Sequence, residues 1–204
     1  MAAALAALYC IAVLSPLLVL AAIRLKGDMS LMHETGTSLA FAAYAVIGLQ
    51  PVLVSRWKWL ERPFGFGVVV RFHRYVGLFA LVMLLGHPPL MAFGGAGLGL
   101  LTDFAQPWYV WLGRVVLLLL ILQAVLSLFF KTFGMTFDQW RWSHNMLAVL
   151  ILPGAFVHSF FGGYDMWPIP MRVLWLVLLG LTVAAYLHLR SSSPRSRKND
   201  PTRA

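Results

Sequence analysis

The sequence predicts an all-α membrane protein, a six-transmembrane-helix bundle with both termini in the cytoplasm. Of its 204 residues, 60% are hydrophobic and only 11% are charged, whereas a soluble domain has about 25% charged residues. The mean hydropathy is +0.80. The net charge of +9 does not indicate nucleic-acid binding, because the basic residues are scattered in short segments between apolar runs and in the tail, as membrane topology requires.

Six apolar segments are each long enough to cross a hydrocarbon core about 30 Å thick. The first is long for a signal peptide and has no basic segment before it, so we interpret it as a retained span. Gly and Pro residues mark several of the linkers. The predicted spans are residues 3–23, 37–55, 68–91, 108–130, 140–161 and 170–189.

The chain is predicted to form one domain, residues 1–190, followed by a disordered basic cytoplasmic tail, residues 191–204, that is rich in Ser, Pro and Arg. Cys10 is the single cysteine, which excludes an internal disulfide and a four-cysteine iron–sulfur cluster. A G-x-G-x-x-G nucleotide-binding fingerprint is absent.

The distribution of Lys and Arg predicts the orientation. Basic residues concentrate between the second and third spans, between the fourth and fifth, and in the tail, which all lie on one side of a six-span protein. We expect that side to be cytoplasmic, so the third and fifth spans both run from inside to outside. The residues are Arg56, Lys58, Arg62, Lys131, Arg195, Arg197, Lys198 and Arg203.

Four histidines form two pairs with equal spacing in the third and fifth spans. His73 and His87 are 14 residues apart, and so are His144 and His158. In an α-helix, 14 residues rise about 21 Å and return to within about 40° of the starting face. The parallel spans then bring His73 level with His144 on the inner side, and His87 level with His158 on the outer side.

Histidine in a membrane span is rare and usually functional. Two neutral imidazoles saturate a haem iron, which favours electron transfer over oxygen binding. The pattern therefore predicts two haem b groups, one above the other across the bilayer. The alternative is that these histidines are hydrogen-bonded core residues. His33, expected in a loop, and His188, expected at the end of the sixth span, are interpreted as interfacial residues.

Three arginines are candidates for binding haem propionates, which need cations. Arg74 and Arg141 flank the inner histidines, and Arg114 lies about two turns inside the fourth span. An arginine within the membrane requires a partner, and an outer-haem propionate would supply one. Arg74 and Arg141 are equally explained as cytoplasmic anchors. Gly77 and Gly86 are expected to let a macrocycle approach the third span.

Two stretches resemble the ferric reductase-like transmembrane domain, which NADPH oxidases, ferric reductases and many bacterial oxidoreductases share. They are residues 59–90, WLERPFGFGVVVRFHRYVGLFALVMLLGHPPL, and residues 140–161, WRWSHNMLAVLILPGAFVHSFF. The resemblance implies that His73 and His144 hold an inner haem, and His87 and His158 an outer one. In larger members a cytoplasmic FAD and NAD(P)H module supplies the electrons. Here FAD or NAD(P)H would act only through a separate flavoprotein, and a quinol is the other expected donor.

A smaller relative is the haem-binding membrane subunit of the periplasmic methionine sulfoxide reductase system. Its W-x-x-L-H-N segment is similar to residues 140–145, but here Ser143 precedes His144. That subfamily has arginine where this chain has His73, and its second pair is about 13 residues apart. The four-histidine pattern thus favours the ferric reductase and oxidase branch, whereas the short flavin-free chain favours the smaller relative.

The sequence leaves three hypotheses. The main one is a multi-pass protein of the bacterial inner membrane that passes electrons from a cytoplasmic donor to ferric iron, oxygen or a periplasmic redox protein. The second is the membrane subunit of a two-component periplasmic methionine sulfoxide reductase. The third is a haem-free transporter or scaffold. Whether the chain is itself an oxidoreductase or the electron-transfer subunit of one stays open.

Overall fold

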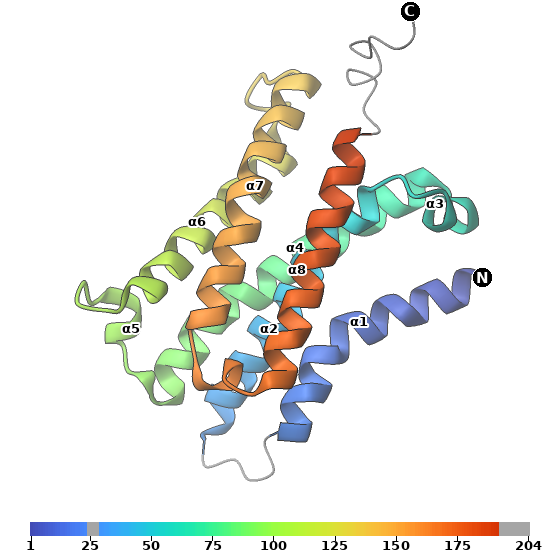
Figure 1. The fold of residues 1–204 in the computed structure, drawn as a ribbon. Coiled ribbons are helices and arrows are strands. Elements are labelled where there is room, and N and C mark those ends of the chain that lie inside the picture. Colours follow the sequence, from blue (N-terminus) through green and yellow to red (C-terminus); the bar gives the residue numbers. More distant parts are fainter. Residues whose placement is uncertain (24–28, 192–204) are drawn as a thin grey trace, which may run out of the picture.

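The computed structural model describes residues 1–23 and 29–191, so all but the first residue of the predicted tail lies outside the described part. Six long helices confirm the predicted number of spans, and the described residues contain no strand (Figure 1). All six are long and apolar enough to cross a membrane. They are α1 (Ala2–Ile23), α2 (Leu31–Val54), α4 (Phe66–Met91), α6 (Trp108–Phe129), α7 (Phe137–Phe161) and α8 (Ile169–Ser191).

Four short helical elements lie between the long ones. The segments predicted as linkers contain α3 (Lys58–Phe64), the π-helix η1 (Ala92–Ala96), α5 (Gly99–Thr102) and the 3₁₀-helix η2 (Tyr164–Met166). Pro88 and Pro89 near the end of α4 remove two backbone donors from the helix. Regular helix ends shortly after this pair, because Gly95 has a positive φ of 125° and the Gly97 N–H donates to the Ala92 carbonyl oxygen at 2.9 Å.

Helix α2 is the central helix of the bundle. Every residue from Phe41 to Leu49 is buried, and α2 makes its most extensive contacts with α4, α8 and α1. Helices α6 and α7 pack on one another as a separate antiparallel pair (Figure 1). Since α2 also contacts α7, and α4 contacts α6, the four helices α2, α4, α6 and α7 form one group.

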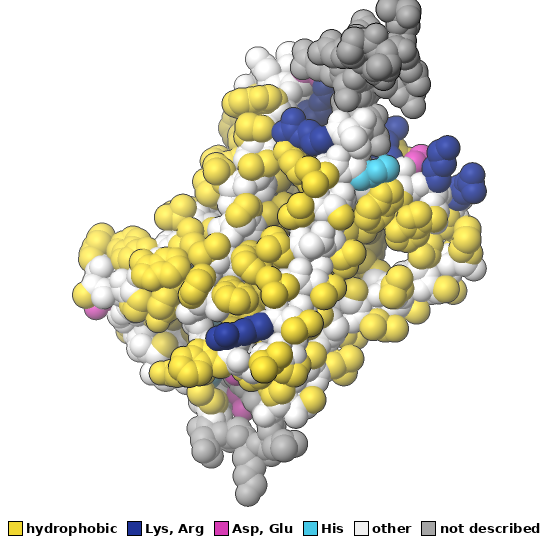
Figure 2. All heavy atoms as spheres, viewed as in Figure 1, with side chains coloured by type: hydrophobic (Ala, Val, Ile, Leu, Met, Phe, Trp, Pro, Cys, Tyr) yellow, Lys and Arg dark blue, Asp and Glu magenta, His cyan; other side chains and the backbone are white. Residues whose placement is uncertain are grey.

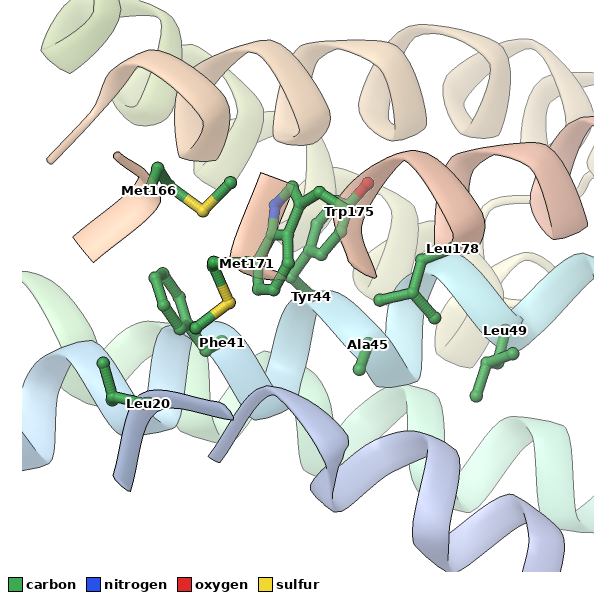
Figure 3. Close-up of a cluster of buried hydrophobic side chains, with 9 residues drawn as sticks. All are labelled: Leu20, Phe41, Tyr44, Ala45, Leu49, Met166, Met171, Trp175 and Leu178. Carbon is green, nitrogen blue, oxygen red and sulfur yellow. The ribbon is translucent and has the colours of Figure 1, made fainter. Parts of the chain in front are cut away.

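An aromatic cluster joins α8 to α2 and α1 (Figure 3). Trp175 is fully buried and packs against Phe41 and Tyr44, with ring centroids 4.7 and 4.9 Å away. Its indole Nε1 donates a hydrogen bond to Ser159 Oγ on α7 at 2.8 Å. Burial of a large ring with its N–H satisfied is favourable in an apolar setting, so this cluster fixes α8 against the other helices.

A second cluster forms an apolar layer across α2, α4, α6 and α7. Ala80 is midway between the two histidines of α4, and Ile151 is midway between those of α7. Both are at most 2% exposed, as is Ala43 on α2. The layer therefore separates the two histidine levels. Its members are Ala42, Ala43, Val46, Ile47, Ala80, Met83, Val116 and Ile151.

The outer surface is dominated by hydrophobic side chains, as expected for helices in contact with lipid (Figure 2). In that view the Lys and Arg side chains gather mainly toward the end of the molecule that carries α3 and the C-terminal end of α8. The orientation predicted from these Lys and Arg residues stays a prediction.

The structure corrects the predicted start of the second span. The sequence places His33 in a loop, but His33 lies in the first turn of α2, which begins at Leu31 rather than at residue 37. Ser30 is the N-cap, and its side chain accepts a hydrogen bond from the His33 backbone N–H at 3.2 Å. A capped N-terminus with Glu34 in the first turn stabilises these additional polar residues as helix.

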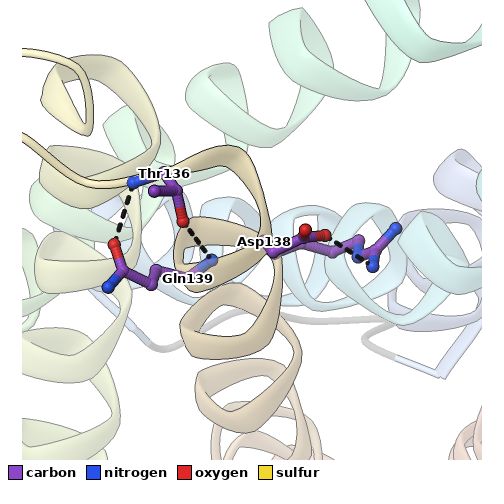
Figure 4. Close-up of polar contacts among 4 residues, drawn as sticks. Thr136, Asp138 and Gln139 are labelled. Atoms are coloured by element: carbon purple, nitrogen blue, oxygen red, sulfur yellow. Dashed lines mark hydrogen bonds and ion pairs between the residues drawn. The ribbon is translucent and has the colours of Figure 1, made fainter.

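Helix α7 begins with a capping box (Figure 4). The Thr136 hydroxyl accepts from the Gln139 backbone N–H at 3.3 Å, and the Gln139 side chain accepts from the Thr136 backbone N–H at 2.9 Å. Two backbone donors are thereby satisfied at the helix end. The cap starts α7 one turn before the predicted residue 140, which places His144 inside the helix rather than near its frayed end.

Candidate haem-binding site

His73 on α4 and His144 on α7 face each other. Their ring centroids are 6.2 Å apart and their planes differ by 60°. Metal–imidazole bonds are about 2 Å long, so two imidazoles on one metal have centroids about 6 Å apart. The two rings thus have a separation that fits one iron between them.

His87 and His158 occupy the corresponding places about four turns further along α4 and α7. They are near enough to interact electrostatically. His87 Nδ1 lies 3.0 Å from the Gly36 carbonyl oxygen on α2, and His158 Nδ1 lies 2.7 Å from the Tyr109 carbonyl oxygen on α6. A carbonyl only accepts, so each Nδ1 carries the proton. Both Nε2 atoms are then unprotonated, which is the form that binds metal.

Gly113 on α6 supplies the space for the His158 ring. A Cβ at this position would lie 2.6 Å from His158 Nδ1 and 2.8 Å from Nε2, and closer still to Cε1. Real Cβ contacts do not become this short, so the imidazole occupies the volume of the missing side chain. Sequence analysis did not identify Gly113 as a site residue.

Ser127 on α6 has the equivalent position beside His144. Its Oγ lies 3.2 Å from His144 Nδ1 and accepts a hydrogen bond from Trp140 Nε1 at 3.4 Å. The Trp140 ring also packs on the imidazole of His144, with centroids 5.4 Å apart. The Ser127 hydroxyl and the Trp140 indole therefore hold the His144 ring, whereas backbone carbonyl groups hold the rings of His87 and His158.

The surroundings of His73 are different again. The Gln50 backbone on α2 lies beside His73, but Nδ1 of His73 is buried and has no hydrogen-bond partner among the described residues. The Gln50 side-chain amide is likewise buried and unpartnered within the described part of the chain. This side of the site contains polar groups that remain available to a bound group.

A spacing of 14 residues recurs on all four helices of the group. The histidine pairs have it, and so do their neighbours Gly36 and Gln50 on α2, and Gly113 and Ser127 on α6. Helix α2 thus lies beside both histidines of α4, and α6 beside both histidines of α7. The signal for Gly113 and Ser127 was present in the sequence, because they interrupt the Leu-rich run of the fourth span at this same interval.

Helices α4 and α7, which carry the four histidines, are not among each other's main packing partners. Helix α4 packs mainly on α2, and α7 mainly on α6. The two helices approach through the imidazoles of His73 and His144. Side chains rather than backbones bridge the two helices at this level.

The arginine candidates are placed differently. Arg74 is exposed. Arg141 forms an exposed ion pair with Asp138 at 2.8 Å, drawn in Figure 4, and its guanidinium lies 5.7 Å from the centroid of the Phe137 ring. Exposed ion pairs of this kind contribute little, so the Asp138 contact does not commit Arg141 to that partner.

Arg114 is bound to α5 and to Asp103, the residue that follows it. One of its terminal nitrogens donates to the carbonyl oxygens of Leu100 at 2.6 Å and Asp103 at 3.0 Å. The guanidinium also lies 4.3 Å from the centroid of the Trp111 ring. The Arg114 Nε is buried without a partner among the described residues. Arg114 therefore fixes the backbone at Leu100 and Asp103, and its Nε–H remains available as a hydrogen-bond donor.

Gly77 and Gly86 both lie next to side chains of α2. A Cβ on Gly77 would contact the Gln50 side chain at 3.8 Å, and one on Gly86 would contact Leu39 at 3.6 Å. Both neighbours belong to α2. The two glycines therefore contribute to the α2–α4 contact, where small residues let helices approach closely, and the expected approach of a macrocycle stays a prediction.

An open apolar groove of about 510 Å³ lies between α1, α2 and α4. None of the four paired histidines lines it. Its lining residues are Val13, Leu14, Leu17, Leu31, Glu34, Thr35, Ser38, Leu39, Ala42, Val46, Phe79 and Met83. The groove is thus a separate feature from the histidine pairs.

These features define a six-helix membrane protein with a pair of histidines at each of two levels. The family described as the ferric reductase like transmembrane component matches residues 39–155. Because the match covers more than half of the chain, the protein belongs to this family. The match includes His73, His87 and His144 and ends three residues before His158. Searches of curated proteins and of solved structures find no match.

Membership supports a role in electron transfer at a membrane. It also agrees with the chemistry of the four imidazoles, since domains of this family generally bind haem. The match falls within the single domain predicted for residues 1–190 and contains most of α2, all of α4 and α6, and the larger part of α7.

Proposed function

We propose that the protein carries electrons across a membrane through two haem b groups. His73 and His144 bind one haem, and His87 and His158 bind the other. The observation that supports this most directly is the 6.2 Å separation of the His73 and His144 rings. The tautomers of His87 and His158 also support it, because the carbonyl oxygens beside their Nδ1 atoms leave Nε2 unprotonated and able to bind iron.

A haem with two imidazole ligands supplies one-electron redox chemistry and has no open position for oxygen. The protein's own residues orient the rings and exclude water. Carbonyl groups of Gly36 and Tyr109 fix the protons of His87 and His158 on Nδ1, and the apolar layer around Ala80 and Ile151 separates the two levels. Helix geometry sets the rise between levels at about 21 Å.

The haem propionates require cations near the membrane surface. Arg74 and Arg141 are exposed beside the His73–His144 level. Near the other level, the buried Nε of Arg114 has no hydrogen-bond partner in the described part of the chain. We assign Arg74 and Arg141 to the haem of His73 and His144, and Arg114 to that of His87 and His158. Arg141 would exchange its exposed contact with Asp138 for a propionate.

The proposed direction of transfer rests on the orientation that Lys and Arg predict and on a donor in the cytoplasm. With both termini in the cytoplasm, the His73–His144 haem lies on the inner side of a bacterial inner membrane. A cytoplasmic flavoprotein or a quinol donates the electrons. The acceptor at the His87–His158 haem is ferric iron, oxygen or a periplasmic redox protein.

Haem content tests the proposal. We expect two haem b groups per chain in the purified protein, measured as the pyridine haemochrome, and one in each of His144→Ala and His158→Ala. His188→Ala is the matched control, because this histidine belongs to neither pair, and it should keep two. A colourless wild-type protein from haem-replete cells, or unchanged haem in both paired-histidine variants, would refute the assignment.

A further inference from the structure

The two histidine pairs differ in what holds the Nδ1 atoms. In the His87–His158 pair, both acceptors are backbone carbonyls. In the His73–His144 pair, His144 is held by the hydroxyl of Ser127, and His73 Nδ1 has no partner among the described residues. Ser127 is therefore the single side chain that hydrogen-bonds a paired imidazole at its Nδ1 in the part of the chain that the structure describes.

The proton positions follow from the chemistry of the ring. A neutral imidazole that binds iron through Nε2 must carry its proton on Nδ1. His144 Nδ1–H then donates to Ser127 Oγ across the 3.2 Å contact. Trp140 Nε1 is only a donor and also points at Ser127 Oγ. The oxygen thus acts as the acceptor toward both residues, which leaves the hydroxyl proton of Ser127 to bond elsewhere.

An acceptor on Nδ1–H makes the imidazole a stronger donor to the metal. Stronger donation stabilises ferric over ferrous iron and so lowers the reduction potential. We infer that Ser127 is a positioning residue that fixes the tautomer of His144 and lowers the reduction potential of the haem held by His73 and His144. The inference rests on the proposed di-haem function.

Ser127 acts on one haem only. It lies 14 residues from Gly113, which is the α6 residue beside the other level, and the apolar layer separates the two. The corresponding acceptors at the His87–His158 level belong to the backbone, which a side-chain substitution leaves in place. A substitution at Ser127 should therefore change the reduction potential of one haem and leave that of the other unchanged.

The test is a potentiometric titration of the purified di-haem protein. Ser127→Ala removes the acceptor and keeps a small side chain. We expect the midpoint of one haem to rise, by up to about a tenfold change in the ferric–ferrous equilibrium, which is about 59 mV for one electron. The other midpoint should not move. The single-haem variants His144→Ala and His158→Ala assign each midpoint to its level.

Two further variants separate tuning from general damage. Ser127→Thr keeps the hydroxyl and should restore the wild-type midpoint. Ser143→Ala is the matched control, because the Ser143 hydroxyl is adjacent to His144 in the chain but donates to the Trp140 carbonyl oxygen rather than contacting an imidazole. It should leave both midpoints unchanged.

The outcomes are distinct. Two bound haems with unchanged midpoints in Ser127→Ala, or an equal shift of both, would overturn the inference and leave the proposed function intact. If Ser127→Ala loses one haem, Ser127→Thr decides: two haems with wild-type midpoints support the hydroxyl's role, and loss of a haem in this variant refutes it. A wild-type protein without two haems refutes the proposed function itself.

Discussion

Gly113 and His158 share one small volume where α6 meets α7. The imidazole occupies the place that a side chain on residue 113 would need. A methyl group added there must displace the ring or separate the two helices, and overpacking of this kind costs about 1–3 kcal/mol. The ring is also held by the Tyr109 carbonyl, so a displaced ring loses this hydrogen bond as well.

Gly113→Ala should therefore remove the haem of the His87–His158 level and leave the other bound. The haem content should fall from two groups per chain to one, with the midpoint of the His73–His144 haem retained. Gly180→Ala is the control, since a Cβ at Gly180 on α8 meets nothing within 4 Å. Full haem content in Gly113→Ala would show that the ring can move without losing the metal.

The sequence identified some residues of the candidate site and missed others. The four histidines were recognisable because a polar ring in an apolar span is rare and their interval was repeated. Gly113 and Ser127 were missed because a glycine or serine in a Leu-rich helix has many ordinary roles. The carbonyl partners of Arg114 on Leu100 and Asp103 were not predicted, because the sequence does not show where backbone carbonyl groups point.

At the scale of helices, Thr182 links α8 to the central helix. It is buried, and its hydroxyl lies 2.6 Å from the Gly48 carbonyl oxygen on α2 and 2.8 Å from the Leu178 carbonyl oxygen in its own helix. Interhelical hydrogen bonds in membrane proteins contribute about 0.6 kcal/mol on average and up to about 1.7 kcal/mol.

Thr182→Val keeps the shape of the side chain and removes this bond. We expect the free energy of unfolding in mixed detergent to fall by about 0.6–1.7 kcal/mol. Thr35→Val is the matched control, because the exposed Thr35 hydroxyl bonds only within its own helix, to the Leu31 carbonyl oxygen; its effect should stay below about 0.5 kcal/mol. Equal effects in the two variants would show that the α2–α8 bond is not stabilising.

Helix boundaries were predictable where the apolar run ended abruptly and wrong where polar residues continued the helix. The fourth span was predicted to within one residue at both ends. The first turn of α2 contains His33 and Glu34, whose polarity suggested a loop, but the Ser30 cap makes this turn helical. Helix α3 was missed because its seven residues include Pro63 and three charged side chains, a composition that also suits a linker.

For the whole molecule, the orientation in the membrane remains a prediction and can be measured directly. Cys10 is the single cysteine, so a Cys10→Ser background carries none. Phe104, between α5 and α6, is 82% exposed and is expected outside. Lys131, between α6 and α7, is exposed and is expected in the cytoplasm.

Single-cysteine variants at these two positions should label differently. In intact spheroplasts, a membrane-impermeant maleimide should modify Phe104→Cys and not Lys131→Cys. After permeabilisation both should react. The reverse pattern would invert the protein, place the His73–His144 level on the outer side and require electrons to enter at the other haem.

The overall architecture was the most predictable level, because six long apolar runs and short linkers leave few alternatives in a bilayer. The grouping of the helices was not predictable in the same way. Uniformly apolar helices carry little information about which face meets which neighbour, so the central place of α2 and the pairing of α6 with α7 required the structure.

The apolar layer at Ala43, Ala80 and Ile151 has a consequence for the energetics of the cell. These side chains offer no hydrogen-bonding group to carry a proton between the two levels, so in the proposed orientation charge crosses the layer as an electron alone. Each electron moving outward crosses the membrane voltage, which is worth about 2.3 kcal/mol per 100 mV. Because the cell interior is negative, the voltage drives this movement and is dissipated by it, and an energised membrane would itself accelerate the export of electrons.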